Sequence, residues 1–534
     1  MERSVIYLIK SEKGEDKKMR STATLRNSMW GIIQQVIVCV LSMFSRRVMI
    51  DTIGVEGVGL NAFLTSVITM LSLAELGIGT AIVYHMYAPI ASGDRVQLAR
   101  LMRTYRNIYR VIAAAIMVLG LCLLPFMDRI VSDVSYSRRY VSLIFMLFLI
   151  QTTSSYLFTY KRSMLSADQN QYIITIFDLG YKIVTIVLGI IILKLTRELA
   201  WYLVMLTVCT VLENMLISRK VDRMYPFLKE HGGRLTKAEN HRIAKDVRNI
   251  FVGKVSGVIT NSTDSILINT LVGTVQNGLY SNYNIILGTL SATLKQFSSA
   301  MRGSVGNLIV TEPPSHIDRV FKRLIFIMFY LAAFCACMLT GLIDPFITLA
   351  FGEGLLLDRV TVFVCILNLY MSTVDIPVWT FVSAAGLFKY DKYISITGSG
   401  INLIISFVLG KRIGMAGILL GTSATYIIQF VLKIILFYKS FLKRSCIGIF
   451  IKNLIFGALT AAECAAAAAL TGMIGRVILN PYAAFAAYAV VSAAIPLVLN
   501  SLIFIKTDEF GYSLDLGKSI IKRFVPRSWH ESKS

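Results

Sequence analysis

Charged side chains inside otherwise apolar stretches are the residues of this 534-residue chain that could do chemistry. An ionisable group at the centre of a lipid bilayer costs about 2.5–3.5 kcal/mol on insertion scales, so it usually faces a polar cavity or a partner. A rise of about 1.5 Å per helical residue places Asp264 and Asp375 near the midplane of such a bilayer. Glu75 and Lys295 fall in the half closer to the cytoplasm. Each of the four is a candidate for binding a polar substrate.

Two pairs of neighbouring charges have alternative interpretations. Asp178 and Lys182 are four residues apart with the acid first, a spacing that favours an ion pair within one helix. The alternative for this pair is a role in a cavity. Arg46 and Arg47 lie near the outer end of the first apolar stretch. There they either extend to external lipid headgroups or form a basic site for an anionic group.

Three further charges, Lys254, Glu213 and Lys433, lie near the inner ends of apolar stretches. For these we favour extension of the side chain toward the cytoplasmic headgroups, with Lys254 kept as a candidate for the cavity. Asp264 and Lys295 lie on adjacent stretches, which favours a shared cavity for that pair.

The balance of acids and bases bears on the cargo. A pump for lipophilic cations needs mostly acids in its cavity, whereas a carrier of phosphate-linked cargo needs bases. This chain has more bases in its apolar stretches than a cation carrier would need. They are Arg46, Arg47, Lys182, Lys254 and Lys295. Arginine binds phosphate through two parallel hydrogen bonds and lysine binds it as a point charge.

Asp264 and Glu75 are the best candidates for an acid that responds to an ion or proton gradient across the membrane. We expect no cofactor, and coupling, if there is any, to H⁺ or Na⁺. The sequence has no G-x-x-x-x-G-K-[ST] motif, so we expect no built-in ATPase. Its five histidines and eight cysteines show no metal-binding or disulfide spacing, and no nucleophile with a matching base is evident. These absences favour transport over catalysis, so we do not expect an enzyme.

The elements that must hold these charges are apolar stretches of about 18–25 residues, roughly fourteen in all, each long enough to cross a hydrocarbon core of about 30 Å as a helix. Charged residues make up 16% of the chain, against about 25% in an average soluble domain. The predicted fold is therefore an all-α polytopic membrane protein of about 14 transmembrane helices.

Charge predicts the orientation. Lysine and arginine collect in the cytoplasmic loops of membrane proteins, so the net charge of +23 needs no nucleic-acid partner. Basic clusters occur in the N-terminal segment, at 85–106, at 219–248 and in the C-terminal tail. With fourteen crossings all four clusters fall on one side, which predicts cytoplasmic N- and C-termini.

A repeat divides the chain. Gly54-x-x-x-x-Gly59-Leu60 matches Gly273-x-x-x-x-Gly278-Leu279, and both motifs mark a turn into the next span. Six spans lie between the two, so the halves share an orientation and are related by an axis along the membrane normal. The predicted segments are an N-terminal cytoplasmic segment (1–27), a first lobe (28–218), a basic cytoplasmic linker (219–248), a second lobe (249–438), a final pair of spans (439–505) and a cytoplasmic tail (506–534).

Three runs in the first part of the chain carry a family resemblance. Gly54-Val-Glu-Gly-Val-Gly-Leu-Asn61, Leu71-Ser-Leu-Ala-Glu-Leu-Gly-Ile-Gly79 and Tyr87-Ala-Pro-Ile-Ala-Ser-Gly-Asp94 resemble the polysaccharide-transporter branch of the MOP (multidrug/oligosaccharidyl-lipid/polysaccharide) exporters, which includes Wzx-type flippases. The resemblance implies two pseudo-symmetric six-helix lobes around a central cavity, a final helix pair, and alternating access in a bacterial cytoplasmic membrane.

The resemblance also implies a cargo and a site. The implied cargo is an undecaprenyl-diphosphate-linked oligosaccharide used in surface polysaccharide synthesis, with membrane lipids, a polymerase and glycosyltransferases as partners. Residues in comparable places to the family's important charges are Arg46, Arg47, Glu75, Asp264 and Lys295. The alternatives left open are a MATE-like multidrug or cation antiporter and a lipid II flippase.

Overall fold

The computed structural model describes residues 2–72, 78–127, 131, 134–168, 170–229, 233 and 235–524, without the side chains of 2–36, of 248–261 and of scattered residues elsewhere. The regular elements of these ranges are helices, as the sequence predicts. The helices of the first part are α1 (Glu2–Leu71), α2 (Ile78–Ser92), α3 (Arg95–Leu123), η2 (Leu124–Phe126), α5 (Arg138–Thr159), α6 (Arg162–Ala167), α7 (Gln171–Thr196), α8 (Leu199–Met224) and η3 (Pro226–Lys229).

The rest of the chain is equally helical. Its elements are α9 (Lys237–Leu271), α10 (Thr274–Thr311), α11 (Pro314–Phe351), α12 (Arg359–Ala384), α13 (Phe388–Leu436), η4 (Phe437–Leu442), α14 (Ile447–Val477), α15 (Pro481–Phe504) and α16 (Asp508–Phe524). Helix α9 begins well inside the predicted linker because Thr236 and Glu239 form a capping box at its first turn.

Two helices contain a break. In α1 the backbone turns at Gly54, which has a φ of 71°. In α13 it turns at Gly414, which has a φ of 64°. The two parts of α13 then pack against each other, since Ser406 donates to the carbonyl oxygen of Ile418 over 2.8 Å. Glycine tolerates this left-handed backbone without steric cost, so the break falls where the sequence predicts the turn between two spans.

Ten helices of the described part are long and apolar enough to cross a membrane, by length and composition alone. Two of their ranges, Ile37–Leu71 and Lys389–Leu442, contain the breaks just described, so the count of helices is not a count of crossings. The fourteen crossings expected from the sequence stay a prediction.

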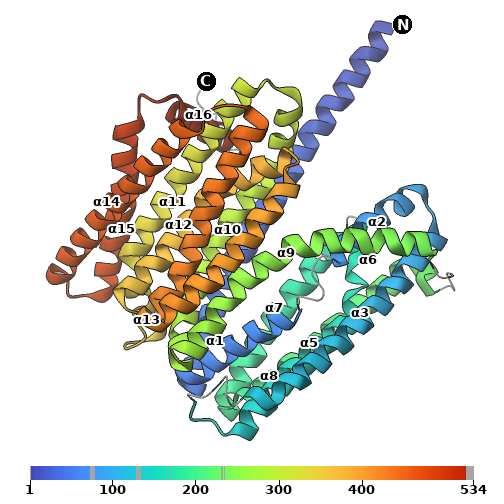
Figure 1. Ribbon diagram of the computed structural model, residues 1–534, viewed down its shortest axis with the longest axis horizontal. Coiled ribbons are helices and arrows are strands. Elements are labelled where there is room, and N and C mark those ends of the chain that lie inside the picture. The colour runs from blue at the N-terminus through green and yellow to red at the C-terminus, as the bar shows by residue number, and fades with distance from the viewer. Residues whose placement is uncertain are drawn as a thin grey trace, which may run out of the picture.

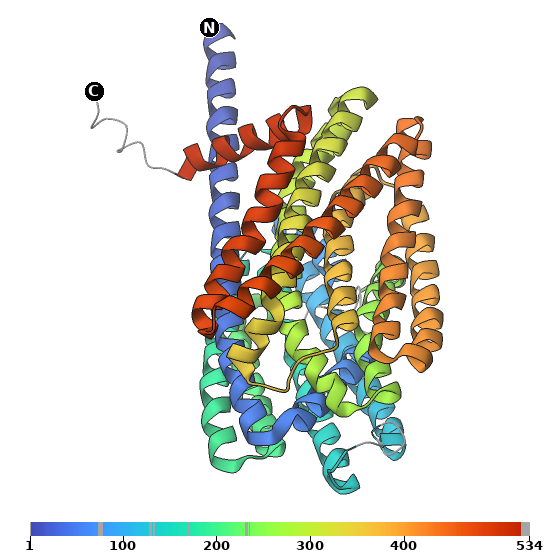
Figure 2. The ribbon, with the colours of Figure 1, turned by 90° about the vertical axis from the view of Figure 1, so that its left-hand side faces the viewer.

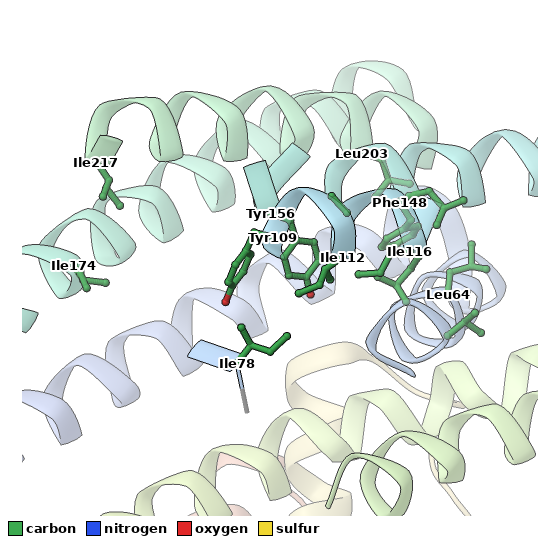
Figure 3. Packing of buried hydrophobic residues seen from close by; sticks show 14 of the residues in the cluster. Leu64, Ile78, Tyr109, Ile112, Ile116, Phe148, Tyr156, Ile174, Leu203 and Ile217 are labelled. Carbon is green, nitrogen blue, oxygen red and sulfur yellow. The ribbon is translucent and has the colours of Figure 1, made fainter. Parts of the chain in front are cut away.

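Three clusters of buried apolar side chains form the interior. The first draws on helices α1 to α9, and the other two are drawn almost entirely from residues after Ile268. Figure 3 shows part of the first cluster, where Leu64 of α1, Ile116 of α3, Phe148 of α5 and Leu203 of α8 approach one another. Each cluster thus joins several helices that are distant in sequence.

The helices form two groups in space (Figure 1). One group contains α2, α3 and α5 to α8, and the other contains α10 to α16. Helix α1 lies in both, and α9 runs from the first group to the second. The start of α1 and helix α16 lie at the same end of the molecule in Figures 1 and 2. This placement agrees with an even number of crossings.

The glycines of the repeat bring the two groups into contact. A Cβ built on Gly59 would lie 2.0 Å from the carbonyl oxygen of Thr274, and one on Gly278 would lie 2.3 Å from that of Val55. The Asn277 amide also donates to the carbonyl oxygen of Gly59 over 3.2 Å. Equivalent positions of the two repeats therefore touch backbone to backbone, and we call this contact the glycine crossing.

We expect Gly278→Leu to force α10 away from α1 at the glycine crossing. Overpacking of this kind costs about 1–3 kcal/mol, so the midpoint of thermal unfolding of the purified protein should fall. The matched control is Gly288→Leu on the same helix, because a Cβ there meets nothing within 4 Å. Equal midpoints for the two variants would contradict a tight crossing.

Candidate functional site

The first predicted base, Arg46, lies on α1 between the two groups of helices. Its Nη1 donates to Ser281 Oγ of α10 over 3.3 Å, and Tyr202 of α8 lies close enough to interact with its charge. No described carboxylate pairs with this partly buried guanidinium. A guanidinium without a carboxylate partner can offer its donors to a phosphate.

The neighbouring base has a different environment. Arg47 forms an ion pair with Asp51 one turn along α1, with Nε and Oδ2 3.1 Å apart and both side chains about half-exposed. Its guanidinium also lies against Gly352 at the end of α11. Successive helical residues point in different directions, so Arg46 and Arg47 contact different parts of the protein.

A charged triad lies within the first group of helices. Arg162 of α6 pairs through Nη1 with Asp178 over 2.6 Å and through Nη2 with Glu213 over 2.8 Å. The predicted pair between Asp178 and Lys182 is therefore wrong: Lys182 is exposed, and Asp178 takes a tertiary partner. The interpretation of Glu213 as extending to headgroups is wrong for the same reason. Arg162 lies in a short helix between spans, so a search confined to apolar stretches missed it.

Asp264 is buried in the second group. Its two carboxylate oxygens accept from the hydroxyl of Thr422 at 3.1 and 2.9 Å, and Asn402 donates to that same hydroxyl at 3.0 Å. The side chain is 6% exposed. Within the described residues no base pairs with it, and Lys295 on α10 is exposed rather than joined to it. Among the described side chains, Asp264 is thus held by the Thr422 hydroxyl, which in turn accepts from the Asn402 amide.

Asp375 of α12 is neutralised inside the protein. Its Oδ2 lies 2.9 Å from the ammonium of Lys433 on α13, whose side chain is 4% exposed. The prediction that Lys433 extends to the headgroups is wrong. The helical path continues past it through η4 to Leu442, which leaves Lys433 deeper than its sequence position suggests.

Two predicted site residues cannot be placed. Glu75 lies outside the described residues, and the side chain of Lys254 lies outside the described side chains. Their roles stay predictions.

An uncharged polar pocket of about 500 Å³ lies inside the first group. Helix α1 contributes Asn61, Thr65 and Thr69, which are four residues apart and so share one face. Helix α5 contributes a second row of polar groups on the facing side. We call this cavity the neutral pocket.

The remaining walls of the neutral pocket come from α5, α7 and α8. Its other polar residues are Gln151, Thr152, Ser155 and Thr159 of α5, Tyr181 of α7, and Tyr202 and Thr210 of α8. Because Tyr202 also lies close enough to interact with the charge of Arg46, the Arg46 guanidinium lies near the neutral pocket. A search for charges missed these residues, and the spacing of Asn61, Thr65 and Thr69 was the one available signal.

Comparison with known proteins identifies the architecture. No family model and no curated protein matches the sequence. A multidrug resistance MATE family transporter of the MOP superfamily, in an inward-facing conformation, superposes with a TM-score of 0.60 and 12% identity over 77% of this chain and 99% of its own. The chain has the MATE/MurJ-like fold.

Two more structures agree with that result. The lipid II flippase MurJ, in an inward closed conformation, gives a TM-score of 0.60 and 15% identity over 88% of this chain and 98% of its own. A variant of the Vibrio cholerae MATE transporter VcmN gives a TM-score of 0.54 and 14% identity over 79% of this chain and 97% of its own. These similar proteins are transporters and a flippase of multi-pass membrane architecture, and at such low identity they show the fold and not the cargo.

We expect Lys433→Met to leave Asp375 as an unpaired buried charge, at a cost of about 3–5 kcal/mol. Removing both charges in the double variant with Asp375→Leu should restore most of that stability, as followed by thermal unfolding in detergent. Transport should recover with stability if the pair is structural. A stable but inactive double variant would show that Asp375 has a further role.

Proposed function

We propose that the chain is a flippase for undecaprenyl-diphosphate-linked oligosaccharides, serving surface polysaccharide synthesis in a bacterial cytoplasmic membrane. The observation that carries the proposal is Arg46, a partly buried guanidinium with a hydroxyl but no described carboxylate beside it. A lipid diphosphate brings the anionic oxygens that such a group lacks.

The fold supports the same proposal. A lipid-linked glycan needs a polar cavity for its head while its tail stays in lipid, and two lobes that rock around a central site meet this need. The glycine crossing joins the lobes at one end, and the resemblance of the sequence to the Wzx-type branch is to carriers of this cargo. We place both termini on the cytoplasmic side, with the membrane lipids, a polymerase and glycosyltransferases as partners.

A lipid II flippase is the second candidate. It is favoured by the likeness to MurJ, which extends over 88% of this chain. It differs from the leading proposal only in the glycan, so purified lipid II and undecaprenyl-diphosphate glycans compared in the same vesicles would separate the two. A drug antiporter is less favoured because Arg46, whose charge interacts with Tyr202 of the neutral pocket, would repel a cationic drug.

Replacement of Arg46 by alanine should weaken the binding of the diphosphate and reduce flipping, each about ten- to a hundredfold, the effect of about 1.5–3 kcal/mol for a charged hydrogen bond. The measurement is flipping of a defined lipid-linked glycan in vesicles that contain the purified protein. Arg47→Ala is the matched control, since that arginine already pairs with Asp51. An equal loss of flipping in the two variants would contradict the assignment of diphosphate binding to Arg46.

We further propose that Asp264 couples transport to H⁺ or Na⁺. It is a buried acid whose described partners are a hydroxyl and, through it, an amide. Asp264→Asn keeps the size of the side chain and removes its charge, so gradient-driven flipping should fall toward the rate without a gradient while the protein remains folded. The measurement is flipping with imposed proton or sodium gradients, and a variant that still responds to both would exclude this role.

A further inference from the structure

The neutral pocket has a composition that suits one class of ligand. Its described lining contains Asn, Gln, Ser, Thr and Tyr together with apolar residues, and no Asp, Glu, Lys, Arg or His. Its volume of about 500 Å³ lies within the range of about 300–1,000 Å³ typical of small-molecule sites. The ligand that such a wall recognises is uncharged and rich in hydroxyl groups.

The hydroxyl groups of the wall are oriented to accept hydrogen bonds. Thr65, Thr69 and Thr159 donate to the carbonyl oxygens four residues before them, over 2.7, 2.8 and 2.9 Å. Their protons are thereby used within the helix, and their oxygen lone pairs remain for a ligand. Sugar hydroxyls are donors that match such acceptors.

Other polar groups of the wall can both donate and accept. In the described part of the chain, Asn61, Thr152 and Ser155 make no side-chain hydrogen bond, although all three line the pocket. Tyr181 is held by Thr210 over 2.9 Å, so its ring is fixed in place. A fixed tyrosine presents an apolar face for the C–H bonds of a sugar ring and a polar tip for its hydroxyls.

The surrounding charges disfavour an acidic sugar. Two charged groups lie near the pocket wall: Arg46, whose charge interacts with Tyr202, and the triad of Arg162 with Asp178 and Glu213 near Tyr181, in which the single base is already paired with two acids. When the diphosphate occupies Arg46, a uronic acid carboxylate in the pocket would lose its water beside a triad whose base is already paired, and burying an unpaired charge is costly. The neutral pocket therefore discriminates by charge as well as by hydrogen bonding.

We propose that the neutral pocket is a subsite for an uncharged sugar, the one attached directly to the diphosphate of the cargo. The geometry points to the diphosphate-proximal sugar because Tyr202 lies in the pocket wall and is close enough to interact with the charge of Arg46, which itself bonds Ser281 of α10. With the diphosphate at Arg46, the first sugar enters the pocket between α1, α5 and α8. This inference rests on the proposed function and adds the chemical class of the sugar.

The test is binding of three probes to the full-length protein in nanodiscs. The probes are farnesyl diphosphate, its N-acetylglucosamine conjugate and its glucuronic acid conjugate. The wild-type protein should bind the N-acetylglucosamine conjugate about tenfold more tightly than either other probe. Equal affinity for all three would overturn the subsite, and this result needs no variant.

A variant locates the preference. Gln151→Leu with Thr152→Val removes two polar groups of the wall and should bring the N-acetylglucosamine conjugate to the affinity of bare farnesyl diphosphate. Thr207→Val on α8, whose residue is not part of the wall, is the matched control and should keep the preference. A preference that survives in the double variant would place the sugar elsewhere.

If farnesyl diphosphate itself fails to bind, the flippase proposal falls and the subsite with it, whereas diphosphate binding without sugar preference refutes the subsite alone.

Discussion

The close approach of two helix backbones at Gly59 and Gly278 is the constraint on which the rest of the structure depends. Each glycine faces a carbonyl oxygen of the other helix at a distance that leaves no room for a side chain. The contact joins the first and second halves of the chain at equivalent points of the repeat. It also brings Arg46 of α1 within reach of Ser281 of α10, less than one turn beyond Gly278.

The charges inside the helices then divide into two kinds. Some are neutralised across helices, as in the triad around Arg162 and the pair between Asp375 and Lys433. Others have partners without formal charge, as Arg46 has Ser281 and Asp264 has Thr422. Paired charges hold helices in register, whereas a charge with only hydroxyl partners keeps free capacity for a ligand or an ion. Our account therefore assigns transport to the second kind.

The sequence predicts the helical class and the turns near Gly54 and Gly414 well, for a physical reason. Apolar length and glycine at a turn are local properties, and Gly54 and Gly414 lie where the chain must reverse. Partner choice is not local. Asp178 has a base at the favourable helical spacing, yet its carboxylate pairs with an arginine from another helix. The sequence position of Lys433 suggests too shallow a depth, because the helical path continues beyond the apolar stretch.

The neutral pocket could not be read from the sequence. Serine and threonine are frequent in membrane helices, where they bond to their own backbone, so apart from the four-residue spacing of Asn61, Thr65 and Thr69 they give no signal of a cavity. Only the folding of α1, α5, α7 and α8 around one space assembles them. The contact between the repeat glycines was equally hidden, although both glycines were recognised as equivalent.

We propose that the two lobes move relative to each other at the glycine crossing as cargo crosses the membrane, and this motion is the central claim to test. The most direct test joins the lobes there with a bifunctional thiol reagent, using cysteines placed on either side of the crossing in a chain that lacks its eight native cysteines. Flipping of a lipid-linked glycan should stop while binding of the glycan persists, and cleaving the linker should restore flipping. Undiminished flipping by the fully joined protein would contradict the account and indicate a fixed groove instead.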